Sequence, residues 1–129
     1  MFTSTKTKTT TAATTPPPVD GPLTEGIKFD AGKPEYGLVP AYALEEVAKV
    51  LTYGAQKYRP NNWRSLSTPH KRYFDAAQRH TWAIARGDVN DPESGLPHAA
   101  HAIACLMFLL EYQICAEKDS AKFLQSTDK

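Results

Sequence analysis

The chain has 129 residues, with 15 basic and 14 acidic side chains and a formal net charge of +1. This length suits one modest domain, and an apolar content of 41% is ordinary for a globular protein. A charge so close to zero gives no global field that would recruit nucleic acid. Specific nucleic-acid binding is therefore not expected, and any anion site must be local.

Three regions of different composition follow one another along the chain. Residues 1–26 are rich in Thr, Lys, Ala and Pro, so they cannot bury enough surface to offset the entropy lost on ordering. We expect a disordered tail there and a helical domain over residues 27–116. A polar C-terminal tail is expected over residues 117–129, beginning as a frayed continuation of the last helix.

Neither a secretory signal nor a membrane span is predicted. No apolar run follows the early lysines, and the longest one, at residues 102–110, is far below the roughly 20 residues needed to cross a bilayer. Cys105 and Cys115 fall on one helical stretch about 15 Å apart, too far to bridge each other. Free thiols fit a reducing compartment, so we expect a soluble cytoplasmic protein.

A first helix is predicted over residues 42–58, where apolar side chains recur at helical spacing. Pro40 supplies a start signal, and Glu45 and Glu46 fall in the first turns, where the helix dipole favours acidic side chains. Adjacent residues on a helix point about 100° apart, so only one of the two glutamates can face the interior. Glu46 lies closer to the apolar stripe.

A second helix is predicted to begin at Thr68-Pro69, a hydroxyl cap followed by proline at the first helical position. It should end near Arg86-Gly87. Its apolar stripe contains His80, which would point the imidazole inward, where it needs partners. A single histidine on an apolar face is more often a satisfied core residue than a ligand, so both roles stay open.

A third helix is predicted to open around Ser94–Pro97 and to run to about Ala116, with apolar side chains on nearly every side. Three helices from about ninety residues make a thin core, and such a helix needs cover on all sides. We therefore expect an all-α fold, a small bundle of about three main helices completed by homo-oligomerisation. The one candidate for extended structure is a short piece at residues 29–39.

Residues that could carry chemistry concentrate between Arg79 and His101. His98 and His101 are three apart, so they share one face of the first helical turn and can converge on one ion. The preceding segment brings Asp91 and Glu93 beside them, and metal sites need such convergence of donors. The alternative is a polar helix start in which these residues serve as caps and turns.

The loop at residues 57–64 combines amides, an indole and cations. Asn62 and Trp63 suit a base that is stacked and hydrogen-bonded, and Lys57 suits a phosphate. The same residues would also make an ordinary loop anchor, with the indole packed on the core. A basic turn at residues 28–34 could place Lys33 over a triphosphate, although it is too short for a phosphate loop of the Walker type.

Five motifs occur in one order along the chain. They are Lys-Phe-Asp-x-Gly-Lys-Pro at 28–34, Val-Leu-x-x-Gly-Ala-x-Lys-Tyr at 50–58, Asn62-Trp63, Arg79-His80, and Asp-x-Glu-Ser-Gly-x-x-His-x-x-His at 91–101. Together they resemble the N-terminal family of phage dATP/dGTP diphosphohydrolases, MazG-like nucleotide pyrophosphohydrolases. The resemblance covers residues 28–112.

This resemblance implies a small, all-helical, oligomeric enzyme that hydrolyses dGTP or dATP to the monophosphate and pyrophosphate, using Mg²⁺ or Mn²⁺. In phages with modified DNA, such an enzyme would act in the host cytoplasm, supplying dGMP and reducing the dATP pool. MazG-like enzymes hold their metals with a Glu-Glu-x-x-Glu helix and a later Glu-x-x-Asp pair. Here Lys49 replaces the third acid, and His98 and His101 replace the later pair, which shifts the metal preference toward Mn²⁺.

The expected site residues fall into four groups. The expected metal ligands are His80, Asp91, Glu93, His98 and His101. The expected catalytic groups are Glu46, His80 and Glu93. The expected phosphate contacts are Lys33, Lys57 and Arg79, and the expected nucleobase contacts are Asn62 and Trp63.

Two other functions remain compatible with the same residues. Histidines and aspartates on helices also build HD-type metal phosphohydrolases, although the adjacent His-Asp pair of those enzymes is absent from this sequence. A helical binding or assembly module of a phage would use the histidines only for capping and packing.

Overall fold

The computed structural model describes residues 26–127, which divide into two units, one ending at Tyr36 and one beginning at Gly37. Apart from residue 26, the tail expected at residues 1–26 lies outside the described residues. In the first unit, the ammonium groups of Lys28 and Lys33 each lie 3.7 Å from the carboxylate of Asp30.

Residues 29–39 do not form the extended piece considered from the sequence. A turn at residues 31–33 is closed by the Lys33 amide, which donates to the Asp30 carbonyl at 3.0 Å, and the 3-10 helix η1 (Tyr36–Leu38) follows. Gly32, with φ 75°, takes the left-handed conformation that glycine adopts without steric cost. The glycine therefore favours a turn where an extended piece was considered.

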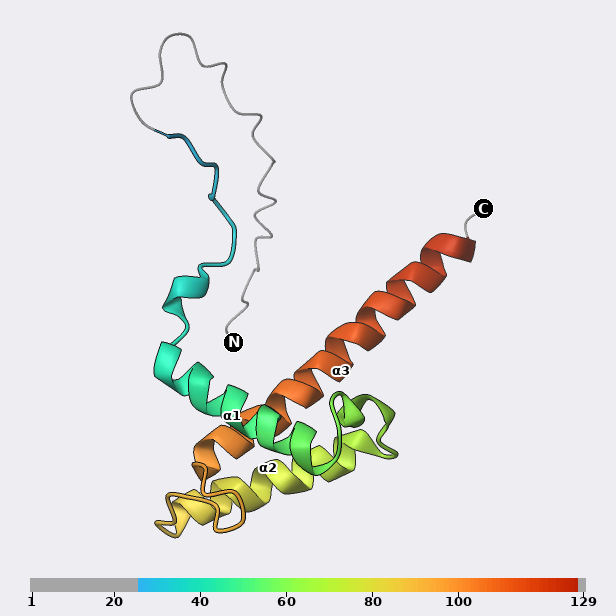
Figure 1. Ribbon diagram of the computed structural model, residues 1–129. Helices are drawn as coiled ribbons and strands as arrows, with labels where there is room; N and C mark the ends of the chain where they lie inside the picture. The colour runs from blue at the N-terminus through green and yellow to red at the C-terminus, as the bar shows by residue number, and fades with distance from the viewer. Residues whose placement is uncertain (1–25, 128–129) are drawn as a thin grey trace, which may run out of the picture. The chain divides into compact units, whose positions relative to one another are not determined.

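The predicted all-α fold with three main helices is confirmed. The helices are α1 (Ala41–Lys57), α2 (Pro69–Ala85) and α3 (His98–Thr127), with the 3-10 helix η2 (Asn62–Ser65) between the first two. Both α1 and α2 pack against the first half of α3, and its second half projects beyond them (Figure 1). No strand occurs within residues 26–127.

Both prolines mark helix starts as predicted, since α1 follows Pro40 and α2 begins at Pro69. The predicted hydroxyl cap at Thr68 is wrong. Thr68 occupies the N-cap position, but its left-handed backbone (φ 50°) differs from the extended conformation of a capping residue, and its side chain makes no cap hydrogen bond. After α2, Gly87 turns the chain away with φ 93°.

The third helix opens where it was predicted but ends later. It begins at His98, directly after the predicted opening at residues 94–97, and it continues to Thr127, whereas the sequence predicted an end near Ala116. Neither glycine nor proline interrupts residues 117–127, and most of these residues tolerate a helix well. The Gln113 side-chain amide donates to Glu117 at 3.0 Å across the predicted end, so the polar segment continues the helix.

The buried core is thin, as expected for three helices. Its apolar members are all small, namely Val47, Val50, Ala77, Ala83, Ala100, Ala102 and Ala104. The valines of α1 pack against the alanines of α3. Four larger apolar side chains of α3 are 41–54% exposed, namely Ile103, Leu106, Met107 and Leu110.

By length and composition, α3 includes a stretch that could cross a membrane, His98–Lys122, with a mean hydropathy of 1.5 and 17% burial within the chain. The prediction that the chain has no membrane span rested on unbroken apolar runs, and it stays a prediction. The averaged hydropathy stays high because Glu111 is the only Asp, Glu, Lys or Arg in residues 98–115. A helix covered by further copies of the chain would share these properties.

Candidate active site

The loop between α2 and α3 is held tightly by backbone hydrogen bonds. The amide of Asp91 donates to the Leu96 carbonyl and that of Gly95 to the Asp91 carbonyl, both at 2.8 Å. The amide of His98 donates to the Val89 carbonyl at 2.9 Å. These bonds bring the acidic loop back onto the first turn of α3.

Three side chains from three elements converge at this point: His80 from α2, Asp91 from the loop and His98 from α3. One ligand atom of each lies within 4.8 Å of the other two, and the Nδ1 atoms of the two histidines are 2.9 Å apart. His98 is buried, and the other two are half-buried. Two imidazoles and one carboxylate, with positions left for water or substrate, are typical of catalytic sites for divalent transition metals. These residues fit a divalent cation.

His101 lies beside this trio without joining it. Its ring stacks on that of His80, with centroids 4.6 Å apart and planes 12° apart. Its Nε2 is 2.7 Å from the Ser94 hydroxyl and 3.9 Å from an Asp91 carboxylate oxygen. The Ser94 hydroxyl thus orients an imidazole, and the two histidines of α3 take different places.

The surroundings favour the protonation states that bind a cation. Burial, and then the neighbouring His101 and His98, lower the pKa of His80, and burial also lowers the pKa of His101. Burial alone would raise the pKa of Asp91, but hydrogen bonds from Ser94, including an amide bond of 2.9 Å, bring it below the ordinary value. The lowered pKa values keep the imidazoles of His80 and His101 neutral and the carboxylate of Asp91 ionised near neutral pH, and metal ligands must be in these states.

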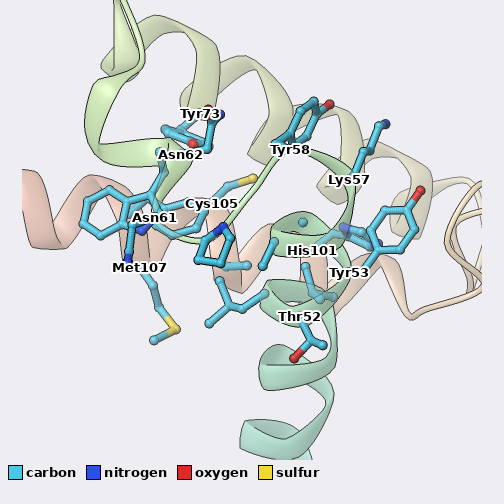
Figure 2. A pocket seen from close by; sticks show the side chains of 18 of the residues that line it. Thr52, Tyr53, Lys57, Tyr58, Asn61, Asn62, Tyr73, His101, Cys105 and Met107 are labelled. Carbon is cyan, nitrogen blue, oxygen red and sulfur yellow. The ribbon is translucent and has the colours of Figure 1, made fainter.

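A cavity of about 840 Å³ opens beside the trio, and its lining includes His80 and Asp91. This volume falls within the range of small-molecule sites. Three labelled residues mark the end nearest the trio in Figure 2, namely His101, Tyr53 and Lys57. Across the cavity from them lie Asn61, Asn62 and Met107, with Cys105 between the two groups.

Trp63 lines the far end of the cavity and also anchors its loop on α3. The indole stacks on Phe108 at 5.0 Å between centroids and meets Tyr112 edge-on at 5.5 Å. The Tyr112 hydroxyl donates to the Trp63 carbonyl, and the Arg64 guanidinium lies 4.3 Å from the ring centroid. A base could stack on this ring only if one of these neighbours moved, so Asn62 is the more accessible of the two predicted base contacts.

Lys57 at the end of α1 and Glu93 in the acidic loop both line the cavity and form an ion pair with each other. The hydrogen bond from Lys57, followed by one from Tyr53, lowers the pKa of Glu93. Lys57, a predicted phosphate contact, and Glu93, a predicted metal ligand, therefore neutralise each other's charge. Glu93, whose side chain is 60% exposed, lies outside the trio of His80, Asp91 and His98.

The remaining predicted residues lie in three different places. Arg79 is exposed and lines the cavity. Glu46 is paired with Lys49 at 2.6 Å and does not line the cavity, so the structure does not bring it to the trio. Lys33 belongs to the first unit, where its nearest acid is Asp30.

The cavity-lining residues to which the sequence gave no part in the site include Tyr53, Cys105 and Glu111. Helical spacing could have found Tyr53, which is four residues before Lys57, and Glu111, which continues the face of α3 that carries His101. Arg59 belongs to the loop at residues 57–64 that the sequence singled out for its cations, and it also lines the cavity.

The family described as dATP/dGTP diphosphohydrolase, N-terminal, matches residues 24–122. The chain belongs to this family. A dATP/dGTP diphosphohydrolase of Salmonella phage PMBT28 is 45% identical over 84 residues, which make up 65% of this chain and 28% of the phage protein. The matched region thus accounts for less than a third of that relative. No solved structure matches the chain. The family resemblance inferred from the five motifs is confirmed.

Proposed function

We propose that this chain hydrolyses a purine deoxynucleoside triphosphate, dGTP or dATP, to the monophosphate and pyrophosphate with the help of Mn²⁺ or Mg²⁺. The observation that carries the proposal is the convergence of His80, Asp91 and His98 at one end of a cavity large enough for a nucleotide. Membership of the family and the name of the phage relative support it. Imidazole ligands favour Mn²⁺ over Mg²⁺.

Three cationic side chains that could bind the phosphates line the cavity together with His80 and Asp91. They are Lys57, Arg59 and Arg79. Within residues 26–127, neither arginine forms an ion pair with a carboxylate, so both guanidinium groups can meet an incoming anion. Bidentate hydrogen bonds from arginine suit phosphate oxygens, and they stabilise charge that develops on a leaving pyrophosphate.

In the proposed reaction, substrate binding breaks the ion pair between Lys57 and Glu93. A triphosphate competes with the carboxylate for Lys57, and its greater charge favours the exchange. Glu93 is then released beside the metal-binding trio as an ionised group that can accept a proton. His101, fixed by Ser94 and unprotonated, is a second acceptor at the same place.

In the proposed reaction, a water oxygen attacks the α-phosphorus and the bond between the α-phosphorus and the bridging oxygen breaks. Pyrophosphate leaves, and Glu93 or His101 accepts the proton of the attacking water. When bound, a divalent cation supplies charge neutralisation and water activation. The chain itself orients the phosphates through its lysine and arginines.

The test is a product analysis. Purified protein is incubated with each of the four dNTPs in Mn²⁺, in Mg²⁺ or in EDTA, and the products are separated by anion-exchange chromatography. We expect equal amounts of monophosphate and pyrophosphate from dGTP or dATP, and none in EDTA. Release of triphosphate or orthophosphate would favour an HD-type reaction, and no product from any dNTP would contradict the proposal.

Two arginines of α2 provide a matched comparison. Replacing Arg79 by glutamine should lower the rate roughly 100-fold, the usual loss when one donor to a developing charge is removed. Arg72 is exposed on the same helix and does not line the cavity, so Arg72→Gln should retain the wild-type rate. Equal rates for the two variants would remove Arg79 from the proposed site.

We also propose that the active form is a homo-oligomer in which α3 is covered by a second copy. Its exposed side chains Ile103, Leu106, Met107 and Leu110 are spaced to form one apolar stripe along the helix. Met107 also lines the cavity, so a copy packed on this stripe would help to close the site.

A further inference from the structure

The cavity has a second polar end that the proposed chemistry does not use. One face of α3 forms part of its lining, from His101 through Ala104, Cys105 and Phe108 to Glu111. Ten residues separate the two polar ends of this face, which places them about 15 Å apart along the helix. The α3 wall of the cavity is therefore apolar in the middle, with an imidazole at one end and a carboxylate at the other.

A nucleotide that lies along the helix has polar and apolar groups in the same order as this wall. Because it assumes a nucleotide substrate, the inference rests on the proposed function. Phosphates at the trio would place the base beside the middle of this wall, where Cys105 lines the cavity and Phe108 is covered by Trp63. The polar edge of the base would then reach Glu111 and the loop that carries Asn62. Figure 2 places Asn61 and Asn62 at the end of the cavity away from His101.

The carboxylate of Glu111 is available to a ligand. It is exposed and makes no ion pair in the part of the chain that the structure describes. Among the described residues, the only side chain that donates a hydrogen bond to it is the Cys115 thiol, at 3.8 Å, and a thiol is a weak donor. An ionised carboxylate accepts hydrogen bonds and donates none, so this end of the cavity selects for a group with donors.

Purine bases differ in this property. Guanine presents two adjacent donors on its Watson–Crick edge, the N1–H and the 2-amino group, which one carboxylate can accept together. Adenine presents a bare N1 acceptor at the corresponding position, and its lone pair repels a carboxylate. We infer that Glu111 is a specificity-determining residue that selects guanine over adenine, so that dGTP is the preferred substrate.

The test measures binding rather than turnover. Calorimetric titrations in Mn²⁺ compare the α,β-imido analogues of dGTP and dATP, which are not hydrolysed at the α–β bond. The wild type should bind the guanine analogue at least roughly tenfold more tightly, as expected for a hydrogen bond to a charged group. The hypoxanthine analogue, which keeps N1–H but lacks the 2-amino group, should bind with intermediate affinity.

Glu111→Gln is the informative variant, because its amide keeps the size of the side chain and adds a donor that can meet adenine N1. The ratio of the two affinities should fall to about one. Glu117→Gln is the matched control, an exposed position on the same helix outside the cavity lining, and it should keep the wild-type ratio. Circular dichroism verifies that both variants fold.

Three results would overturn the inference: no binding of either analogue, a wild-type preference below about twofold, or a ratio unaffected by Glu111→Gln. Failure of the proposed function would look different. In that case, the guanine analogue would bind with the expected preference, while hydrolysable dGTP would yield no pyrophosphate.

Discussion

Replacing Asp91 by asparagine should remove most of the stabilisation that Mn²⁺ gives to the folded chain. Asparagine keeps an oxygen that can accept the Ser94 amide, whose present bond to Asp91 is 2.9 Å, so the loop should keep its shape. The negative charge that Asp91 brings to the trio is lost. The variant thus separates the proposed metal-binding role of Asp91 from its structural role.

The expected magnitude follows from binding linkage. At a Mn²⁺ concentration of about 100 Kd, binding stabilises the wild type by about 2.7 kcal/mol. For a domain of this size, that corresponds to a rise in Tm of roughly 10–20 °C. If losing a charged ligand weakens binding about 100-fold, the same concentration stabilises the variant by about 0.4 kcal/mol, a rise of roughly 2–3 °C.

Differential scanning fluorimetry with and without Mn²⁺ measures both shifts. Asp88→Asn is the control, because it removes the same charge from an exposed position that pairs only with Arg86, at 3.5 Å. This control should keep the wild-type shift. An equal shift in Asp91→Asn, or no shift in the wild type, would refute the assignment of the trio as a metal site.

Three further predictions concern the loop, the phosphates and the oligomer. Tyr112→Phe removes the hydroxyl that donates to the Trp63 carbonyl. Urea titration should show a loss of about 1 kcal/mol in the free energy of unfolding. An unchanged midpoint of unfolding would mean that this bond does not anchor the loop. Lys57→Gln should slow pyrophosphate release roughly 100-fold. Lys71 lies outside the cavity lining, so Lys71→Gln should keep the wild-type rate. Equal rates for the two variants would argue against phosphate binding by Lys57. Leu106→Glu places a charge on the apolar stripe of α3, and light scattering should show a smaller particle than the wild type; an unchanged mass would place the interface elsewhere.

The helices were predictable where local signals are strong. Proline fixes its own φ and lacks an amide donor, so Pro40 and Pro69 favour helix starts whatever surrounds them. The end of α3 was missed because a polar composition alone does not stop a helix, and no glycine or proline follows Ala116 before residue 127. The cap at Thr68 failed because its left-handed backbone, with φ 50°, differs from the extended conformation that a capping side chain needs.

The candidate site was only partly predictable. The spacing of Asp91 and His98 on either side of a turn, together with the inward face of His80, was enough to predict that they would meet. The pairing of Lys57 with Glu93 was not, because it depends on how the end of α1 lies against a loop 36 residues away in sequence. Sequence spacing reports which side chains share an element, but not which elements lie next to each other.

In the proposed reaction, water attacks the α-phosphorus of a purine deoxynucleoside triphosphate. Hydrolysis of dGTP by the purified chain in water enriched in heavy oxygen, followed by mass spectrometry of both products, shows which phosphorus receives the water oxygen. We expect one heavy oxygen in dGMP and none in the pyrophosphate. Label in the pyrophosphate, or dGTP left intact in the presence of Mn²⁺, would contradict the proposal.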